Sequence, residues 1–383
     1  MTKTKEMLKK NSMLIAVVIV TLFFTIQTGG TLLAPQNLNN LIAQNGYVVI
    51  LAVGMLMCIL TGGNIDLSVG SVVALVGAVA GTLIVNMKMN IVMAILICLG
   101  VGIAIGVWQG FWIAYARIPA FIVTLAGMLL WRGVALIVLD GLTISAFPEN
   151  YLALFNSYIP DIFGGTINTL CLVVGVVICV LYIIASILNR MDKVKKGYTV
   201  ELMGVLISKI VVICAVILAT AYSLAHYKGI PAILIILAVI VVIYSYYTSK
   251  TVPGRHLYAL GGNEKAARLS GINTNKVLFF AYVNMAFLSA VAALVCVARF
   301  NSAAPTAGTN YELDAIGSCF IGGASAYGGT GTVGGAVIGA IFMGVLNNGM
   351  SIMGIDSNFQ RAVKGLVLLA AVAFDVLSKQ KSK

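Results

Sequence analysis

Long apolar segments separated by short polar ones dominate this chain. Most of them are about 18 residues or longer, which is enough for a helix to cross a bilayer. The pattern predicts twelve membrane-spanning helices, with boundaries near 13–33, 41–61, 67–85, 91–115, 119–139, 168–188, 203–225, 230–248, 277–299, 312–326, 333–353 and 361–378. The basic start of the chain resembles a signal peptide, but no small-residue cleavage site follows it, so we expect an uncleaved first span.

Composition supports a membrane protein. The 383 residues are 60% hydrophobic and only 9% charged, against about 25% charged in a soluble domain. A net charge of +12 could suggest nucleic acid, but the basic residues lie in short loops between apolar runs, and we expect no nucleic-acid partner. We therefore predict an all-α polytopic membrane protein, one domain over 1–383, with membrane lipid as its solvent.

The distribution of Lys and Arg predicts the orientation. With the N-terminus in the cytoplasm, 17 of the 24 basic residues fall on the cytoplasmic side, four outside and three within spans. This bias predicts cytoplasmic N- and C-termini. The three within spans are Arg132, Lys209 and Lys364. Arg132 needs a function or an acidic partner, for which Asp140 and the outer acidic loop are candidates, whereas Lys209 and Lys364 are expected only to anchor span ends.

A charge interrupts the apolar pattern at "TGGNIDLSVG", residues 61–70. An Asp at the centre of a spanning helix costs about 2.5–3.5 kcal/mol, so irregular backbone is expected where Gly62 and Gly63 end the second span. Asp66 either caps the third helix or lines a solute path, and the residues leave both open. Deeper polar side chains that could hydrogen-bond a solute are Gln109, Asn284 and Asn347.

The aromatic residues Trp108, Trp112 and Tyr115 share one face of the fourth span, and Arg117 follows them. These rings could stack on a sugar, but the adjacent Arg117 favours a position in the aromatic belt at the inner face of the membrane. Small residues four apart, as at Gly102, Gly106 and Gly110, indicate close helix packing.

Residues 249–276 form a basic inner loop, "TVPGRHLYALGGNEKAARLSGINTNKV". We predict a Pro-Gly turn, a short strand or turn, and then a short helix with Asn263 as N-cap and Gly271 as its stop. The loop is either an amphipathic helix on the membrane surface or a docking surface for a cytoplasmic partner.

Known catalytic sequence motifs are absent from the chain. No phosphate-binding loop, metalloprotease H-E-x-x-H or G-x-S-x-G elbow occurs, and the seven cysteines form no cluster. We therefore expect a transport protein rather than an enzyme, with no catalytic residue, metal site or cofactor of its own.

Four stretches resemble the permease subunit of ribose/xylose-type (multiple-monosaccharide) ABC sugar importers: "GGNIDLSVGSVVALVGA", "PAFIVTLAGMLLWRGVAL", "GRHLYALGGNEKAARLSGI" and "YELDAIGSCFIGGASAYGG" with its continuation. The resemblance implies a homodimer that works with a separate cytoplasmic ATPase, which uses the ATP, and an extracytoplasmic sugar-binding protein. It also implies a bacterial inner-membrane location and a monosaccharide substrate. A ten-helix core plus two extra spans at about 168–228 would follow.

The resemblance assigns roles to particular residues. ATPase coupling is implied for Gly254, Arg255, Gly261, Gly262, Asn263, Glu264, Ala267, Arg268 and Gly271. Together with the polar residues above, the candidates for the translocation path are Asn64, Asp66, Ser68, Gln109, Arg132, Asn284 and Asn347.

Other functions stay open at this point. A permease of the same superfamily could carry a nucleoside or an amino acid. An ion-coupled secondary transporter could use Asp66 or Glu312 as a proton site. A non-transporting scaffold or receptor subunit is the third alternative.

Overall fold

The computed structural model describes residues 12–165, 167–198, 200 and 203–380. Over these residues the regular secondary structure is helical apart from two short strands, which confirms the predicted all-α class. The helices run Ser12–Gln27 (α2), Pro35–Leu60 (α3), Val69–Gly81 (α4), Ile91–Ala114 (α5), Ala120–Leu139 (α6), Glu149–Asn156 (α7), Thr169–Lys195 (α8), Met203–Ala225 (α9), Ala232–Lys250 (α10), Val252–Gly262 (α11), Glu264–Leu269 (α12), Thr274–Phe300 (α13), Tyr311–Ile321 (α14), Val333–Ile352 (α15) and Ser357–Gln380 (α16). A 3₁₀ turn at Thr31–Leu33 (η1) precedes α3, and a π-helical turn at Thr82–Asn86 (η2) continues α4.

Each of the twelve predicted segments coincides with a helix. Among the described residues, nine helices are long and apolar enough to cross a membrane. Of the other three, α2 is short and α14 has only 11 residues, whereas α16 has 24 residues and a strongly amphipathic sequence. The number of crossings therefore stays a prediction.

The chain forms two compact units. One contains residues 33–42 and 157–232, and the other contains the rest. In the smaller unit α8 packs on α9, and Asp161 accepts hydrogen bonds from the backbone N–H groups of Thr169 and Leu170 at the start of α8. This unit includes the predicted two-span addition at 168–228, whose boundaries stay a prediction.

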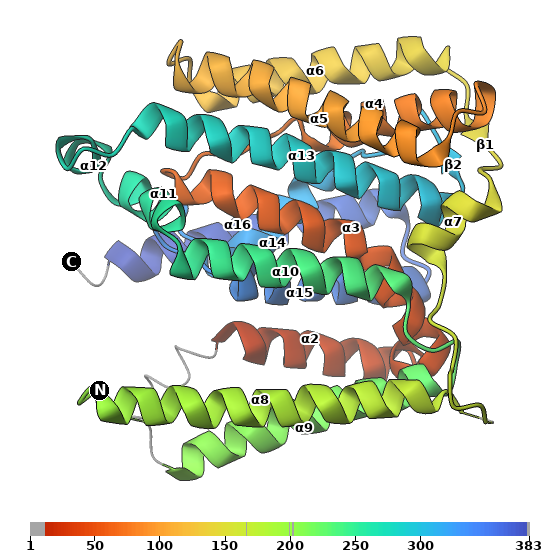
Figure 1. Ribbon diagram of the computed structural model, residues 1–383, viewed down its shortest axis with the longest axis vertical. Coiled ribbons are helices and arrows are strands. Elements are labelled where there is room, and N and C mark those ends of the chain that lie inside the picture. Colours follow the sequence, from red (N-terminus) through yellow and green to blue (C-terminus); the bar gives the residue numbers. More distant parts are fainter. Residues whose placement is uncertain (1–11, 166, 199, 201–202, 381–383) are drawn as a thin grey trace. The chain divides into compact units, whose positions relative to one another are not determined.

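The larger unit is built around α3, α4 and α13, the apolar windows of which are 72–78% buried. The helix α5 packs along α13, α6 along α4, and α14 lies between α15 and α16 (Figure 1). Gly102 and Gly106 meet Ala290 and Val283 of α13, so the predicted role of the glycine spacing in packing is confirmed. Neighbouring helices approach closely because the glycines present no side chain to one another.

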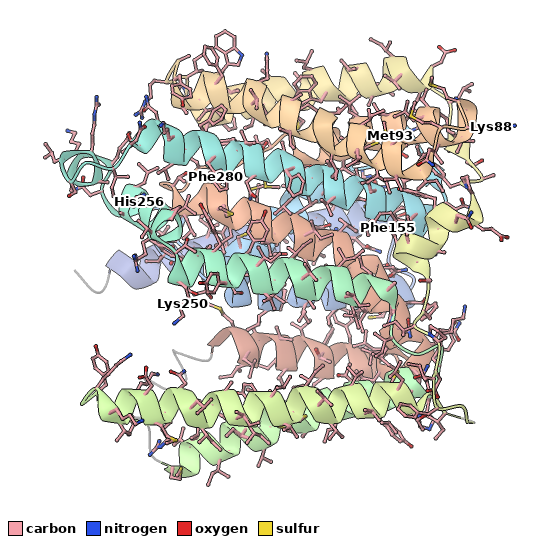
Figure 2. All side chains as sticks on the ribbon, viewed as in Figure 1. Lys88, Met93, Phe155, Lys250, His256 and Phe280 are labelled. Carbon is pink, nitrogen blue, oxygen red and sulfur yellow. The ribbon has the colours of Figure 1, made fainter. Side chains whose placement is uncertain are left out.

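The two ends of the larger unit differ in structure. At one end, strand β1 (Ile144–Ser145) pairs antiparallel with β2 (Ser302–Ala303) beside α7. The hydroxyl of the buried Tyr151 donates to the Leu294 carbonyl at 2.8 Å, which fastens α7 to α13. At the opposite end lie α11, α12 and the C-terminal end of α16 (Figure 1). Lys250 and His256 lie at this second end, and Lys88 lies at the first (Figure 2).

We predict that Gly102→Val destabilises the protein by about 1–3 kcal/mol, because overpacked interiors carry a penalty of that size. A Cβ at this position would lie 2.5 Å from the Ala290 Cβ and 3.0 Å from the Ala286 carbonyl oxygen. Thermal unfolding in detergent measures the effect. Gly100→Val is the matched control because a Cβ there meets nothing within 4 Å; equal losses in both variants would contradict the packing role.

Candidate functional site

Three of the predicted path residues form one buried hydrogen-bonded chain. Between α3 and α4, the Asp66 carboxylate accepts from the Ser68 N–H at 2.8 Å and from the Ser68 hydroxyl at 2.6 Å. The Ser68 oxygen in turn accepts from Gln109 Nε2 of α5 at 2.6 Å. All three side chains are at most 1% exposed. Asp66 thus satisfies an amide just before α4, as a cap would, and also begins a polar chain that reaches another helix.

A second break lies between α13 and α14. After β2 the chain runs through irregular residues 304–310 and then forms α14, whose 11 residues rise about 16 Å, half of a hydrocarbon core of about 30 Å. The two broken elements meet: a Cβ on Gly70 would lie 2.0 Å from the Gly308 carbonyl oxygen and 2.7 Å from a Glu312 carboxylate oxygen. Helices α4 and α14 therefore begin next to each other.

The sequence carries a signal for this second break that was missed. "NIDLSVGS" at 64–71 is echoed by "NYELDAIGS" at 310–318, with Asp66 matched by Glu312 and Gly70 by Gly317. The second stretch is one residue longer, and the acids are placed differently. Asp66 lies three residues before the start of α4, whereas Glu312 lies in the first turn of α14.

Arg132 does not pair with Asp140, so that expectation is wrong. Its guanidinium donates to the carbonyl oxygens of Pro305 and Ala307 at 3.2 and 2.5 Å, within the irregular segment before α14. The acidic side chain that interacts electrostatically with this guanidinium is Glu312. Asp140 lies exposed at the end of α6 in a left-handed conformation, where it serves as C-cap. Irregular backbone inside a membrane protein needs such internal partners, and Arg132 supplies them.

Lys364 does more than anchor a span end, which corrects the sequence-based expectation. Its ammonium lies 2.9 Å from one Asp314 carboxylate oxygen and 3.1 Å from the other, and the two side chains are only 15% and 3% exposed. This buried ion pair fastens α16 to α14. Next to it, the rings of Tyr47 and Tyr311 stack at 4.1 Å.

The remaining predicted path residues lie apart from this chain. Asn64 donates to the Thr61 carbonyl and hydroxyl in the bend after α3. Asn284 on α13 accepts from the Tyr244 hydroxyl and contacts the Met57 sulfur. Asn347 lies on α15, and its buried Oδ1 lacks a hydrogen-bond partner among the described residues. The structure therefore joins Asp66, Ser68 and Gln109, and leaves the other candidates separate.

The basic inner loop is more helical than predicted. Residues Val252–Gly262 form helix α11, so the expected strand or turn there is wrong. Thr251 caps α11 through the Gly254 N–H, and Pro253 fits its first turn. The second prediction is confirmed: Asn263 caps α12 by accepting from the Ala266 N–H, and Gly271 ends it with φ +84°.

Helix α12 is tied to the neighbouring helix ends. Arg117, which follows α5, donates to Glu264 at 2.6 Å, to Thr274 at 3.2 Å and to Asn275. Among the other residues of the segment, Arg255 and Arg268 are exposed, whereas Ala267 is buried against the protein. The exposed surface of α11 and α12 is basic, and Leu269 stands 90% exposed beside it.

Backbones meet without side chains where α11 reaches the two broken elements. A Cβ on Gly261 would lie 1.9 Å from the Leu60 carbonyl oxygen and 2.5 Å from the Gly329 nitrogen. The Gly329 N–H donates to that same Leu60 oxygen at 3.1 Å. A Cβ on Gly63 would lie 2.0 Å from the Ala326 carbonyl oxygen. We call this contact among Leu60–Gly63, Gly261–Gly262 and Ala326–Gly329 the glycine junction.

Tyr258 adds a side-chain link to the glycine junction. Its hydroxyl donates to the Gly331 carbonyl oxygen at 3.0 Å. Desolvation by burial raises the pKa of this hydroxyl above its ordinary value, so it stays a donor at neutral pH. The sequence singled out Gly62, Gly63, Gly261 and Gly262, and Gly328 and Gly329 lie at the end of one of the stretches that resemble the permease family. Their mutual contact was not predicted, because only the tertiary fold brings these segments together.

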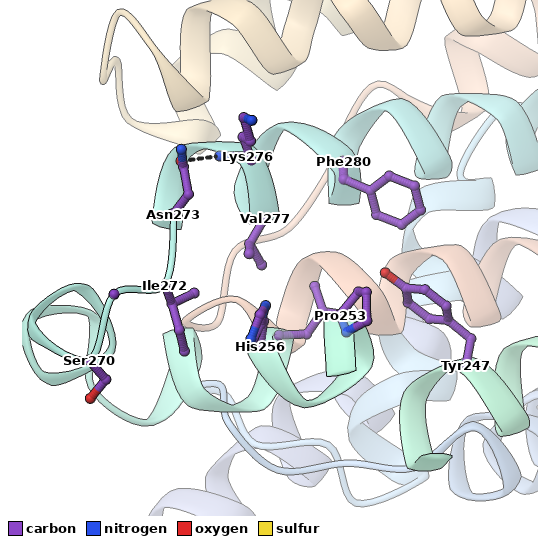
Figure 3. A pocket seen from close by; sticks show the side chains of 11 residues that line it. Tyr247, Pro253, His256, Ser270, Ile272, Asn273, Lys276, Val277 and Phe280 are labelled. Carbon is purple, nitrogen blue, oxygen red and sulfur yellow. Dashed lines mark hydrogen bonds between the residues drawn. The ribbon is translucent and has the colours of Figure 1, made fainter. Parts of the chain in front are cut away.

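A cleft of about 520 Å³ opens beside α11. Ile272, Val277 and Phe280 face Pro253 and His256 across it, and the Tyr247 ring closes one side (Figure 3). Its walls are mainly apolar. The cleft therefore offers an apolar recess next to the exposed basic residues of the segment.

Aromatic side chains gather on α5 and α6. Trp108 and Trp112 are 36% and 37% exposed, and Tyr115 is 46% exposed, in keeping with an aromatic belt. Trp131 of α6 joins them, with its ring centroid 5.3 Å from that of Trp108 in an edge-to-face arrangement. Within the described part of the chain, no group of three or more His, Cys, Asp or Glu side chains could hold a metal ion.

Comparison with known proteins identifies a family and several relatives that are similar over most of the chain. Residues 37–372 match the family described as branched-chain amino acid transport system / permease component. The chain is 36% identical over 369 residues to the xylose transport system permease protein XylH of Haemophilus influenzae, covering 96% of each chain. It is 35% identical to XylH of Escherichia coli, covering 97% of this chain and 92% of the relative. No solved structure matches.

A ribose permease is also among the relatives. The ribose import permease protein RbsC of Escherichia coli is 34% identical over 341 residues, covering 89% of this chain and 85% of the relative. The matches therefore extend across α3 to α16 and include both breaks and the basic segment.

We predict that Lys364→Met destabilises the fold by about 3–5 kcal/mol, because it leaves the Asp314 carboxylate buried and unpaired. Unfolding in detergent with increasing denaturant measures the loss. The double variant Lys364→Met/Asp314→Leu should recover most of it, since an apolar pair removes the buried charge. A single variant as stable as the wild type would contradict the assigned role of the pair.

Proposed function

This chain belongs to the family of permease components of branched-chain amino acid transport systems and related importers, and we propose that it imports monosaccharides as the transmembrane subunit of an ATP-driven ABC transporter. The observation that carries the proposal is the similarity to xylose and ribose permeases over nearly the whole chain. The chain is a multi-pass inner-membrane transport subunit, and ATP hydrolysis belongs to a separate subunit.

The proposed partners follow from this assignment. A cytoplasmic ATPase supplies the power, and an extracytoplasmic binding protein delivers the sugar. We further propose twelve crossings, both termini in the cytoplasm and a homodimer within the lipid bilayer. The position of the C-terminal end of α16 on the same side as α11 and α12 supports this orientation (Figure 1).

The docking surface for the ATPase is the basic segment 249–276. The residues that take part are Gly254, Arg255, Gly261, Gly262, Asn263, Glu264, Ala267, Arg268 and Gly271. The exposed Leu269 and the apolar cleft beside α11 suit apolar side chains of a partner. Exposed Arg255 and Arg268 suit acidic ones.

The translocation path runs along the two breaks. Its candidate residues are Asn64, Asp66, Ser68, Gln109, Arg132, Asn284 and Asn347. Among these, the Asp66–Ser68–Gln109 chain lies at the start of α4, and Arg132 holds the segment that begins α14. Broken helices supply polar backbone to solute paths in other transporters.

The glycine junction connects docking to the path. A push on α11 by the ATPase reaches the end of α3 through Gly261 and Leu60, and it reaches the 326–329 turn after α14 through Gly329. Because these are contacts between backbones, motion of α11 is transmitted to the end of α3 and to the 326–329 turn without a flexible side chain in between. Helices α4 and α14, which are joined to these segments, then move relative to their neighbours, and the path opens.

An amino acid remains the alternative substrate class, since the family description names branched-chain amino acids. An ion-coupled transporter is the less favoured alternative, because the similarity to xylose and ribose permeases extends over nearly the whole chain. Among the buried acids, Asp314 is paired with Lys364, and Asp66 accepts two hydrogen bonds from Ser68.

We predict that an ATPase subunit co-purifies with the chain from mild detergent. Reversing charge at Arg268, as in Arg268→Glu, should lower the co-purified amount, because the basic surface loses its complementarity to the partner. Quantification of the ATPase per permease tests this. Co-purification at an unchanged ratio with Arg268→Glu would contradict the docking role of α12.

We predict that Gly261→Ala uncouples the transporter, so that ATP hydrolysis continues while sugar uptake falls at least tenfold. The added Cβ forces α11 away from the Leu60 carbonyl and breaks the backbone contact. Uptake and hydrolysis are measured on the same reconstituted complex.

Gly334→Ala is the matched control for this prediction, because Gly334 is neither in the glycine junction nor among the docking residues. A Cβ at Gly334 meets nothing within 4 Å, and the residue lies within helix α15. Its uptake should equal that of the wild type. If both variants transported normally, the glycine junction would have no part in coupling.

A further inference from the structure

Two buried polar atoms beside the Asp66–Ser68–Gln109 chain lack a hydrogen-bond partner among the described residues. They are Oε1 of Gln109 and Nε1 of Trp131. Buried polar atoms in native proteins are nearly always hydrogen-bonded, so an unsatisfied one needs an explanation. Here one atom can only accept and the other can only donate.

The hydrogen-bonded chain fixes which amide atom of Gln109 is left over. The Ser68 hydroxyl gives its proton to Asp66 Oδ1, so its oxygen must accept from the amide Nε2 of Gln109. Exchanging the two amide atoms would place two acceptors against each other. The acceptor Oε1 is therefore the unsatisfied atom, and the Gln109 side chain is fully buried.

The amide and the indole converge at Gly127 of α6. A Cβ at this glycine would lie 2.7 Å from Gln109 Nε2, 3.3 Å from Trp131 Nε1 and 3.4 Å from Ser68 Cβ. No larger residue leaves room between the two groups. The glycine thus lets the Gln109 amide, whose Oε1 is unsatisfied, lie beside the unsatisfied indole N–H of Trp131.

A hydroxyl group is the chemical group that satisfies both atoms at once. It can donate to Oε1 and accept from the indole N–H. We propose that Gln109 and Trp131 bind one hydroxyl of the solute during its passage, with the indole of Trp108 beside them offering an apolar ring face. This deepens the proposed function and rests on it, since a monosaccharide carries several hydroxyls on an apolar ring edge.

The binding place is closed in this conformation. Both atoms are inaccessible to solvent, whereas Trp108, whose ring lies 5.3 Å from that of Trp131, is 36% exposed. Separation of α6 from α5 uncovers the two atoms together. Because Gln109 also holds Ser68 just before α4, the solute hydroxyl is bound next to the break that the glycine junction controls.

The test measures uptake by the reconstituted complex with its ATPase and binding protein. Trp131→Phe keeps an aromatic ring and removes the donor. Gln109→Met keeps the length and removes the acceptor. The substrates are the transported sugar and those of its monodeoxy analogues that the wild type also carries, and each is compared between variant and wild type so that selection by the binding protein cancels.

The proposal expects each variant to raise the half-saturating concentration of the parent sugar roughly fivefold, the size of one lost hydrogen bond. For one analogue, the same one in both variants, the loss should vanish because the contacted hydroxyl is already absent. Trp112→Phe is the control and should change nothing, since among the described residues Trp112 makes ring contacts with Trp108 and Phe111 but none with Trp131.

Three results would overturn the proposal. They are wild-type uptake by both variants, equal losses for every analogue, and insensitive analogues that differ between the two variants. In each case the ATP-driven uptake of the wild type leaves the proposed function intact. Uptake by the wild type that does not depend on the ATPase would instead overturn the function itself.

Discussion

Backbone amides and carbonyls that leave a helix inside a membrane must find partners within the protein, because lipid offers none. This constraint governs the two breaks of the chain. At residues 60–68 the Asp66 carboxylate binds the Ser68 amide and the Gly329 amide binds the Leu60 carbonyl. At residues 304–310 the guanidinium of Arg132 binds two carbonyl oxygens. The charged residues of an otherwise apolar chain lie where the backbone needs them.

The same constraint explains the glycines. Where α11 meets the end of α3 and the 326–329 turn, the backbones approach to distances that a side chain would prevent, as at Gly261 and Leu60. The Gly329 N–H also donates to the Leu60 carbonyl there. The result is a backbone contact that joins the basic segment to the end of α3 and to the 326–329 turn after α14. A membrane protein that receives its driving force from a separate cytoplasmic subunit needs a contact of this kind, because it connects the docking segment to the elements that line the path.

Much of this architecture can be read from the sequence, for identifiable reasons. Long apolar runs predicted twelve of the helices, and the caps Asn263 and Gly271 predicted α12, because helix length and capping are local properties. Asp66 and Gln109 were found because polar residues in apolar runs are conspicuous. The failures were tertiary: the partners of Arg132 and Lys364 come from segments more than 40 residues away in the chain. Helix α11 was missed because "VPGRHLYALGG" carries glycines at both ends, and its packing against Leu60 overrides their weak helix propensity.

In this mechanism the chain forms the solute path, and the energy for transport comes from a separate ATPase subunit. Uptake of labelled sugar into proteoliposomes tests this most directly, with the purified chain alone, with an imposed ion gradient, and with the ATPase, binding protein and ATP added. The account predicts accumulation only in the complete system with ATP on the ATPase side. Accumulation by the chain alone under an ion gradient would contradict it.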